Sequence, residues 1–107
     1  MCKYAHTFFD EKLDKFVAAL EKPTISKVLR MLELLEQFGN LLGMPHSKKV
    51  GDRLFELRVR GQQEVRIFYS FHKGTAVLLH GFIKKSDRIP TKELAIALQK
   101  LHSLDTL

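Results

Sequence analysis

The 107-residue sequence contains a single cysteine, Cys2, and no long apolar run. One cysteine cannot form an internal disulfide or a zinc site, so we expect a reducing, cytoplasmic environment. Residues 1–16 are charged and lack the apolar core of a signal peptide. The longest uncharged stretch near the middle, 74–83, is about half of the roughly 20 residues that a membrane-spanning helix needs. These absences predict a soluble protein with no membrane partner, and the length predicts one domain, 1–107.

The sequence also lacks internal repeats, low-complexity tracts and several well-known catalytic signatures. It has no Walker-type phosphate loop, no cysteine–histidine spacing typical of zinc sites and no serine-hydrolase elbow. We therefore expect neither a metal ion nor a cofactor.

Positive charge, by contrast, is plentiful and unevenly distributed. The chain has 18 lysines and arginines against 12 aspartates and glutamates, which gives a net charge of +6. The charges balance in 1–44 and in 91–107, so the whole excess lies in 45–90. A localised basic surface attracts polyanions by neutralising phosphates and releasing counterions. Nucleic acid and an acidic protein are both possible partners, and a merely solubilising surface is the alternative.

Apolar residues at three- and four-residue spacing predict three helices. The first covers 8–20, and the second covers about 24–38 with Gly39 at its C-terminal cap. The third begins near the end of the chain, where Thr91 is expected to be its N-terminal cap.

Between the second and third helices the apolar pattern changes to a period of two. Residues 40–52 form an irregular connector, and strands are predicted over 54–60, 64–72 and 75–83. The short breaks between these strands favour hairpins. The fold class predicted is therefore α+β, with an N-terminal helical hairpin packed on one face of a small antiparallel meander and a C-terminal helix.

The same alternation places charged side chains on the sheet face that points away from the helices. The basic candidates come from three strands and the turn after them: Arg58, Arg60, Arg66, His80, Lys84 and Lys85. Exposed charges on a sheet usually alternate in sign across strands, but Glu56 and Glu64 can neutralise only part of this set. We expect one basic, partly concave surface.

Three stretches together resemble the toxins of bacterial toxin–antitoxin pairs: "GDRLFELRVR", "VRIFYSF" and "VLLHGFIKKSDRIPTKELAIALQKL". They combine an E-L-R strand, an R-I-F-Y strand, an F-x-K-K turn and a P-x-x-E helix. Over 41–101 the chain resembles the RelE/ParE superfamily, in particular its HigB-type branch, which includes phage-derived homologues. The resemblance implies a helical hairpin beside an antiparallel sheet.

For the ribonuclease members, the resemblance implies metal-independent cleavage of messenger RNA, often on the translating ribosome. It also implies a cognate HigA-like, helix-turn-helix antitoxin that neutralises the toxin and helps to repress the operon. We expect no operator binding by the toxin without its antitoxin. The alternatives are a ParE-like poison that binds DNA gyrase without catalysis, and an inactive prophage remnant that still binds its antitoxin.

Metal-free RNA cleavage needs a base for the 2′-hydroxyl, cations for the charged transition state and an acid for the 5′-oxygen. Arg66, in "EVRIFY", matches the arginine that the family places on the scissile phosphate, and Arg58 is a second candidate of the same kind. Lys84 or Lys85 follows the last strand, where the family carries a catalytic basic residue. Salt bridges to neighbouring glutamates are the alternative role for the arginines, and a solvated turn is the alternative for the lysines.

His80 is a further acid–base candidate, because imidazole changes its charge near neutral pH, although its apolar strand equally fits a packed histidine. Phe68 is expected either to stack on a nucleobase or to fill the floor of the groove. Tyr69 alternates with core residues and is interpreted as packing. The remaining predicted RNA contacts are cations of the sheet, the connector and the last turn: Arg60, Lys48, Lys49 and Arg88. His46 lies in the same connector, and no strong general base is visible.

Overall fold

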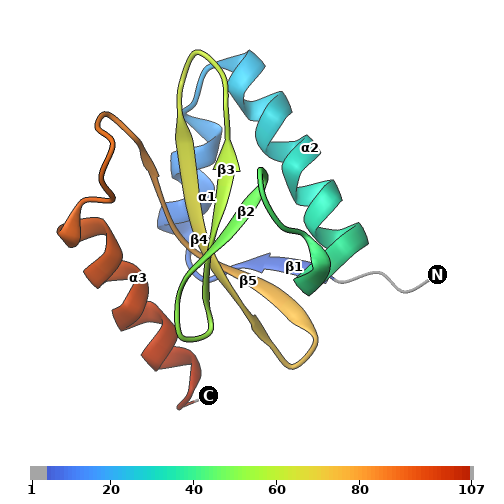
Figure 1. Cartoon of the computed structure of the whole chain (residues 1–107), viewed down its shortest axis with the longest axis vertical. Helices are drawn as coiled ribbons and strands as arrows, with labels where there is room; N and C mark the ends of the chain where they lie inside the picture. The colour runs from blue at the N-terminus through green and yellow to red at the C-terminus, as the bar shows by residue number, and fades with distance from the viewer. Residues whose placement is uncertain (1–4, 107) are drawn as a thin grey trace.

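The computed structural model describes residues 5–106, so Cys2 lies outside the described part of the chain. Five strands and three α-helices follow one another along it (Figure 1). Their order is β1 (Ala5–Phe8), α1 (Glu11–Ala18), α2 (Lys22–Phe38), the 3-10 helix η1 (Gly39–Leu41), β2 (Ser47–Gly51), β3 (Leu54–Val59), β4 (Val65–His72), β5 (Thr75–Ile83) and α3 (Thr91–Leu104). None of the helices described is long and apolar enough to cross a membrane.

The strands form one five-stranded mixed sheet in the order β1-β5-β4-β3-β2. Strands β2 to β5 pair antiparallel, whereas β1 pairs with β5 in parallel, with Ala5 opposite Thr75 and Phe8 opposite Leu78. The predicted small antiparallel meander is therefore wrong. The sequence pattern missed β1 and β2 because each has at most five residues, too few for a clear period of two.

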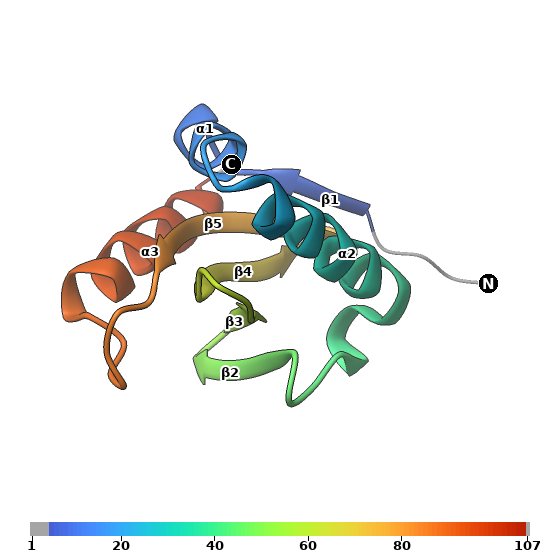
Figure 2. The ribbon, with the colours of Figure 1, turned by 90° about the horizontal axis from the view of Figure 1, so that it is seen from above.

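The helices cover both faces of this sheet, as Figure 2 shows, with α2 and α3 on opposite sides. One buried cluster joins α1 and α2 to the sheet through residues such as Leu13, Leu35 and Ile67. A second cluster joins α3 to the other face through Phe68, Leu79 and Leu101. The predicted arrangement, a helical hairpin over a small antiparallel sheet whose arginine-bearing face points away from the helices, is therefore wrong, because α3 covers that second face. An amphipathic stripe predicts that a helix is buried, but it does not say against which face of the sheet.

The ends of the helices follow local capping chemistry. The first helix begins at Glu11, later than predicted, because Asp10 is its N-terminal cap and accepts a hydrogen bond from Leu13 N at 3.2 Å. Gly39 ends α2 with a φ of 56°, which confirms the predicted glycine cap. Thr91 is the first residue of α3, and Pro90 occupies the cap position, so the predicted threonine cap is wrong. The predictions for β3, β4 and β5 are confirmed to within one residue.

Candidate functional site

The face of the sheet that packs against α3 carries rows of side chains set by the strand register. In the first row, Lys48 of β2 lies opposite Glu56 of β3, which lies opposite Phe68 of β4 and then His80 of β5. Side chains in one such row are direct neighbours. The register therefore places side chains from four strands next to one another. The face of the sheet that carries them, which packs against α3, is called the arginine face below.

The next row of the arginine face contains Arg58, Arg66 and Phe82, from β3, β4 and β5. Beyond it, the same alternation places Arg60 and Lys84 at the rim. Lys84 stays close to β4, because its backbone N donates to Glu64 O at 2.6 Å. Cations from β2, β3, β4 and the end of β5 thus converge on this face.

The two central arginines are bound to carboxylates. Arg58 Nε donates to Glu56 Oε1 at 3.2 Å, and Arg66 Nη1 donates to Glu64 Oε2 at 3.1 Å. Arg66 Nε lies 3.9 Å from Glu56 Oε1. Arg66 is 3% exposed and Glu56 is 2% exposed, so both belong to the interior. The salt bridges named as the alternative role of the arginines are therefore present.

Two atoms of this network are buried without a hydrogen-bond partner among the described residues: Glu56 Oε2 and Arg66 Nε. An unpaired buried polar atom costs roughly 1–3 kcal/mol. Such atoms are uncommon in proteins and are found at strained or functional positions. The Glu56–Arg66 contact is thus a buried and incompletely hydrogen-bonded part of the arginine face.

His80 is held by the third helix. Its Nε2 lies 2.7 Å from Glu93 Oε1, and Glu93 is the glutamate of the P-x-x-E stretch. The register shift between Phe68 and Tyr69 makes Leu79 an extra residue of β5. Leu79 packs against α3 and His80 bonds to it, so this bulge turns two successive side chains towards the same helix.

Phe68 forms the floor of the arginine face. It is fully buried and stacks on Phe82, with ring centroids 5.6 Å apart. Of the two roles expected for Phe68, the structure places it in the floor. Tyr69 faces the opposite side, is buried and stacks on Phe55, which confirms that it is a packing residue.

Three of the predicted cations lie elsewhere. Lys49 pairs with Phe55 and therefore points to the opposite face from Lys48. Lys85 lines a pocket at the end of β5 with Phe82 and Glu93, and Arg88 is exposed in the segment that leads to α3. The structure does not bring these three side chains to the central arginines.

The sequence indicates Glu56 and Glu64 as partial neutralisers and as alternative salt-bridge partners of the arginines, but it assigns no role to Glu93. A signal for the first two exists, because Glu56–Arg58 and Glu64–Arg66 repeat an E-x-R spacing that places both charges of each pair on one strand face. The contact of Glu93 with His80 joins a helix to a strand and has no such local signal. Within residues 5–106, no group of three or more potential ligands is placed to hold a metal ion.

These features define a small protein with a mixed sheet, helices on both faces and a basic cluster across four strands. Residues 15–102 match the family model described as phage derived protein Gp49-like (DUF891). Because the match spans most of the chain, the protein belongs to this Gp49-like family. Membership is consistent with a toxin-like protein of a toxin–antitoxin system. No curated protein is similar enough to this chain to count as a match.

Proposed function

We propose that this protein is the HigB-type toxin of a type II toxin–antitoxin system, and that it cleaves messenger RNA at the arginine face without a metal ion. The observation that supports the proposal most is the convergence of Lys48, Arg58, Arg66 and Lys84 on one face. These four cations outnumber the two carboxylates beside them, those of Glu56 and Glu64. An excess of positive charge at one place favours binding of a phosphate backbone.

In the proposed reaction the 2′-oxygen of RNA attacks the neighbouring phosphorus. The bond from phosphorus to the 5′-oxygen breaks, which leaves a 2′,3′-cyclic phosphate and a 5′-hydroxyl. Arg58 and Arg66 stabilise the charge that develops on the phosphoryl oxygens. To do so, Arg66, whose side chain is 4% exposed, has to exchange its contact with the 39% exposed Glu64 for the phosphate.

Proton transfer is assigned to groups at the two ends of the same face. His80, oriented by Glu93, lies one row away from Arg66 and is the acid–base candidate of the strand itself. Lys84 at the rim is the second candidate. The proposed partners are messenger RNA, the ribosome and a helix-turn-helix antitoxin, with action in the cytoplasm.

One observation favours a different function. Arg66 is buried and contacts two glutamates, as expected of an arginine that supports folding alone. In that case the protein would act by binding, as a gyrase-directed poison does, and its basic face would be a docking surface.

Primer extension on cellular messenger RNA after brief induction separates these functions. Since Arg66→Ala risks unfolding, the half-buried rim variant Lys84→Ala is tested beside Arg66→Lys, with Lys15→Ala on α1 as the charge-matched control for Lys84→Ala. We expect new 5′ ends inside translated regions with the wild type and Lys15→Ala, and their loss with the other two variants. Intact messages in arrested cells would overturn the ribonuclease proposal in favour of a binding poison. An inert wild type would indicate an inactive remnant.

A further inference from the structure

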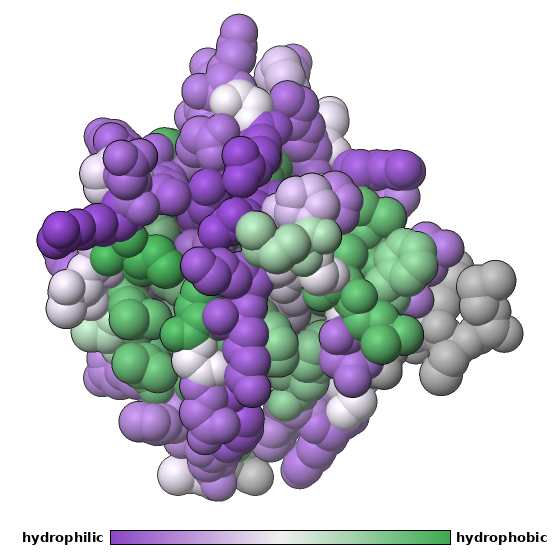
Figure 3. Space-filling view, viewed as in Figure 1, coloured by the Kyte–Doolittle hydropathy of each residue, from purple (hydrophilic) through white to green (hydrophobic). Residues whose placement is uncertain are grey.

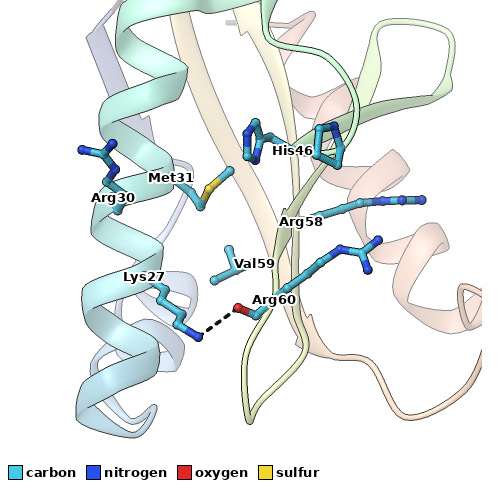
Figure 4. A pocket seen from close by; sticks show the side chains of 8 residues that line it. Lys27, Arg30, Met31, His46, Arg58, Val59 and Arg60 are labelled. Atoms are coloured by element: carbon cyan, nitrogen blue, oxygen red, sulfur yellow. Dashed lines mark hydrogen bonds between the residues drawn. The ribbon is translucent and has the colours of Figure 1, made fainter.

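A groove of about 230 Å³ lies between α2 and the end of β3 (Figure 4). Its floor is apolar and is made by Met31 of α2, Val59 of β3 and Pro45 of the connector. In Figure 4, His46 is turned towards Met31, whereas the side chains of Arg58 and Arg60 point away from α2. The groove is therefore a separate site from the arginine face, on the other side of β3.

Every charged residue that lines this groove is basic: Lys27, Arg30, Arg58 and Arg60. Lys27 also bridges the two walls, because its Nζ donates to Arg60 O at 3.2 Å. Because the side chains of Arg58 and Arg60 point away, the charges at the groove itself are those of Lys27 and Arg30 of α2, and a positive local potential favours an acidic occupant.

An exposed apolar patch lies at the end of α2, in η1 and in the connector that leads to the groove. Leu41 is 83% exposed, Met44 is 63% exposed and Phe38 is 44% exposed. Met44 directly precedes Pro45 of the groove floor. In Figure 3, hydrophobic side chains gather on the right of the molecule, over the end of α2 and η1. Contiguous apolar surface of this kind marks an interaction site in a small protein.

We propose that this groove and patch together form a docking surface for an acidic, amphipathic segment of a partner protein. The apolar side of the segment contacts Leu41 and Met44 and enters the groove above Met31. Its carboxylates meet Lys27 and Arg30 at the rim. The stretch of α2 from Lys27 to Phe38 is roughly 17 Å long at 1.5 Å per residue, which matches about three turns of a partner helix.

The composition of the surface favours a protein over RNA. Proteins read RNA mainly by stacking aromatic rings or arginine planes on unpaired bases. The groove floor instead consists of a thioether, a proline ring and a valine, and Leu41 and Met44 are more exposed than Phe38 in the patch beside it. Flexible apolar side chains such as methionine suit the irregular apolar surface of a peptide.

Fluorescence anisotropy with a defined probe tests this proposal. The probe is a fluorescein-labelled peptide with leucines on one helical face and glutamates on the other, and its control has serine at every leucine. The variant Lys27→Glu/Arg30→Glu reverses the rim charge, and Lys15→Glu/Lys92→Glu changes the net charge equally at exposed positions elsewhere. We expect about tenfold weaker binding for the rim variant, and less than twofold for the control.

The apolar half of the surface is tested by Leu41→Ser, which removes an exposed side chain and leaves the core intact. We expect about tenfold weaker binding of the leucine peptide and unchanged binding of the serine peptide.

Equal losses of peptide affinity in both charge variants would overturn the proposal, because they indicate non-specific attraction. Failure of the leucine peptide to bind would overturn it as well. A single-stranded RNA that outcompetes the peptide, with the same sensitivity to Lys27→Glu/Arg30→Glu, would assign the surface to RNA. Message cleavage by these variants is measured in parallel, so a failed docking site is distinguished from a failed ribonuclease.

Discussion

Arg58 and Arg66 lie directly opposite each other on β3 and β4, so two like charges occupy neighbouring positions of the sheet. Like charges at opposed positions destabilise a strand pair. Glu56 offsets this repulsion, since its Oε1 is 3.2 Å from Arg58 Nε and 3.9 Å from Arg66 Nε. The arrangement keeps two guanidinium groups side by side, with a buried carboxylate next to them.

Replacing that carboxylate should destabilise the fold. We predict that Glu56→Gln lowers the free energy of unfolding by about 3 kcal/mol, because it leaves the buried Arg66 beside a neutral group. Urea unfolding followed by circular dichroism measures this change, and Glu33→Gln on the exposed side of α2 is the control. A loss below about 0.5 kcal/mol would mean that Glu64 alone balances Arg66.

A second variant separates the charge of this network from its volume. Apolar replacement of a complete buried ion pair is often neutral or stabilising. We therefore predict that Glu56→Leu/Arg66→Met is more stable than Glu56→Gln, although it carries two substitutions. If the double variant is the less stable of the two, the packing around Glu56 and Arg66 matters more than their charges.

Glu64 is expected to compete with RNA for Arg66. Glu64→Gln removes the charge that holds Arg66 Nη1, while the change in stability stays below about 1 kcal/mol because Glu64 is partly exposed. We predict roughly threefold to fivefold tighter binding of a 2′-O-methyl RNA, which cannot be cleaved, in fluorescence anisotropy at fixed salt. The control Glu33→Gln changes the net charge by the same amount. Equal gains in RNA affinity from Glu64→Gln and Glu33→Gln would exclude a specific competition between Glu64 and RNA for Arg66.

Much of the fold is predictable from the sequence, because α2, β3, β4 and β5 are long enough for their apolar periods to be clear. The edge strands are different. β1 has only four residues, and it becomes a strand by pairing with Thr75–Leu78, far away in the sequence. β2 reads "SKKVG", and two of its five residues are lysines, which are typical of connectors and of protected sheet edges alike.

The candidate site is predictable only in part, for a related reason. The period of two correctly groups Arg58, Arg66 and Glu56 on one side of the sheet. It does not reveal that α3 covers part of this side, and so it gave no warning that Arg66 is buried. Burial of a charged residue depends on which helix packs over it, and that is decided by contacts between distant residues.

Gly81 sets how closely α1 approaches β5. A methyl group at this position would lie 2.9 Å from Phe16 Cε2 and 3.0 Å from Leu13 Cδ1. We predict that Gly81→Ala lowers the free energy of unfolding by about 1–3 kcal/mol, since α1 has to shift. Gly43→Ala is the control, because no heavy atom lies within 4 Å of the added methyl group there. Equal urea midpoints for the two variants would contradict the close packing of α1.

The buried phenol of Tyr69 should make the protein sensitive to alkaline pH. Burial raises the pKa of Tyr69 above its usual value of about 10, although its hydrogen bond of 2.5 Å with Ser47 partly opposes this. The unfolded chain therefore loses the phenol proton of Tyr69 at a lower pH than the folded chain does. The contribution of this proton to the free energy of unfolding is complete below about pH 10 and is lost as the pH rises through the folded-state pKa. We predict that the urea midpoint falls as the pH rises above about 10. In Tyr69→Phe the fall should be smaller, from a starting stability about 1 kcal/mol lower because Ser47 loses its partner. Parallel curves for both proteins would show that lysines, not Tyr69, cause the alkaline transition.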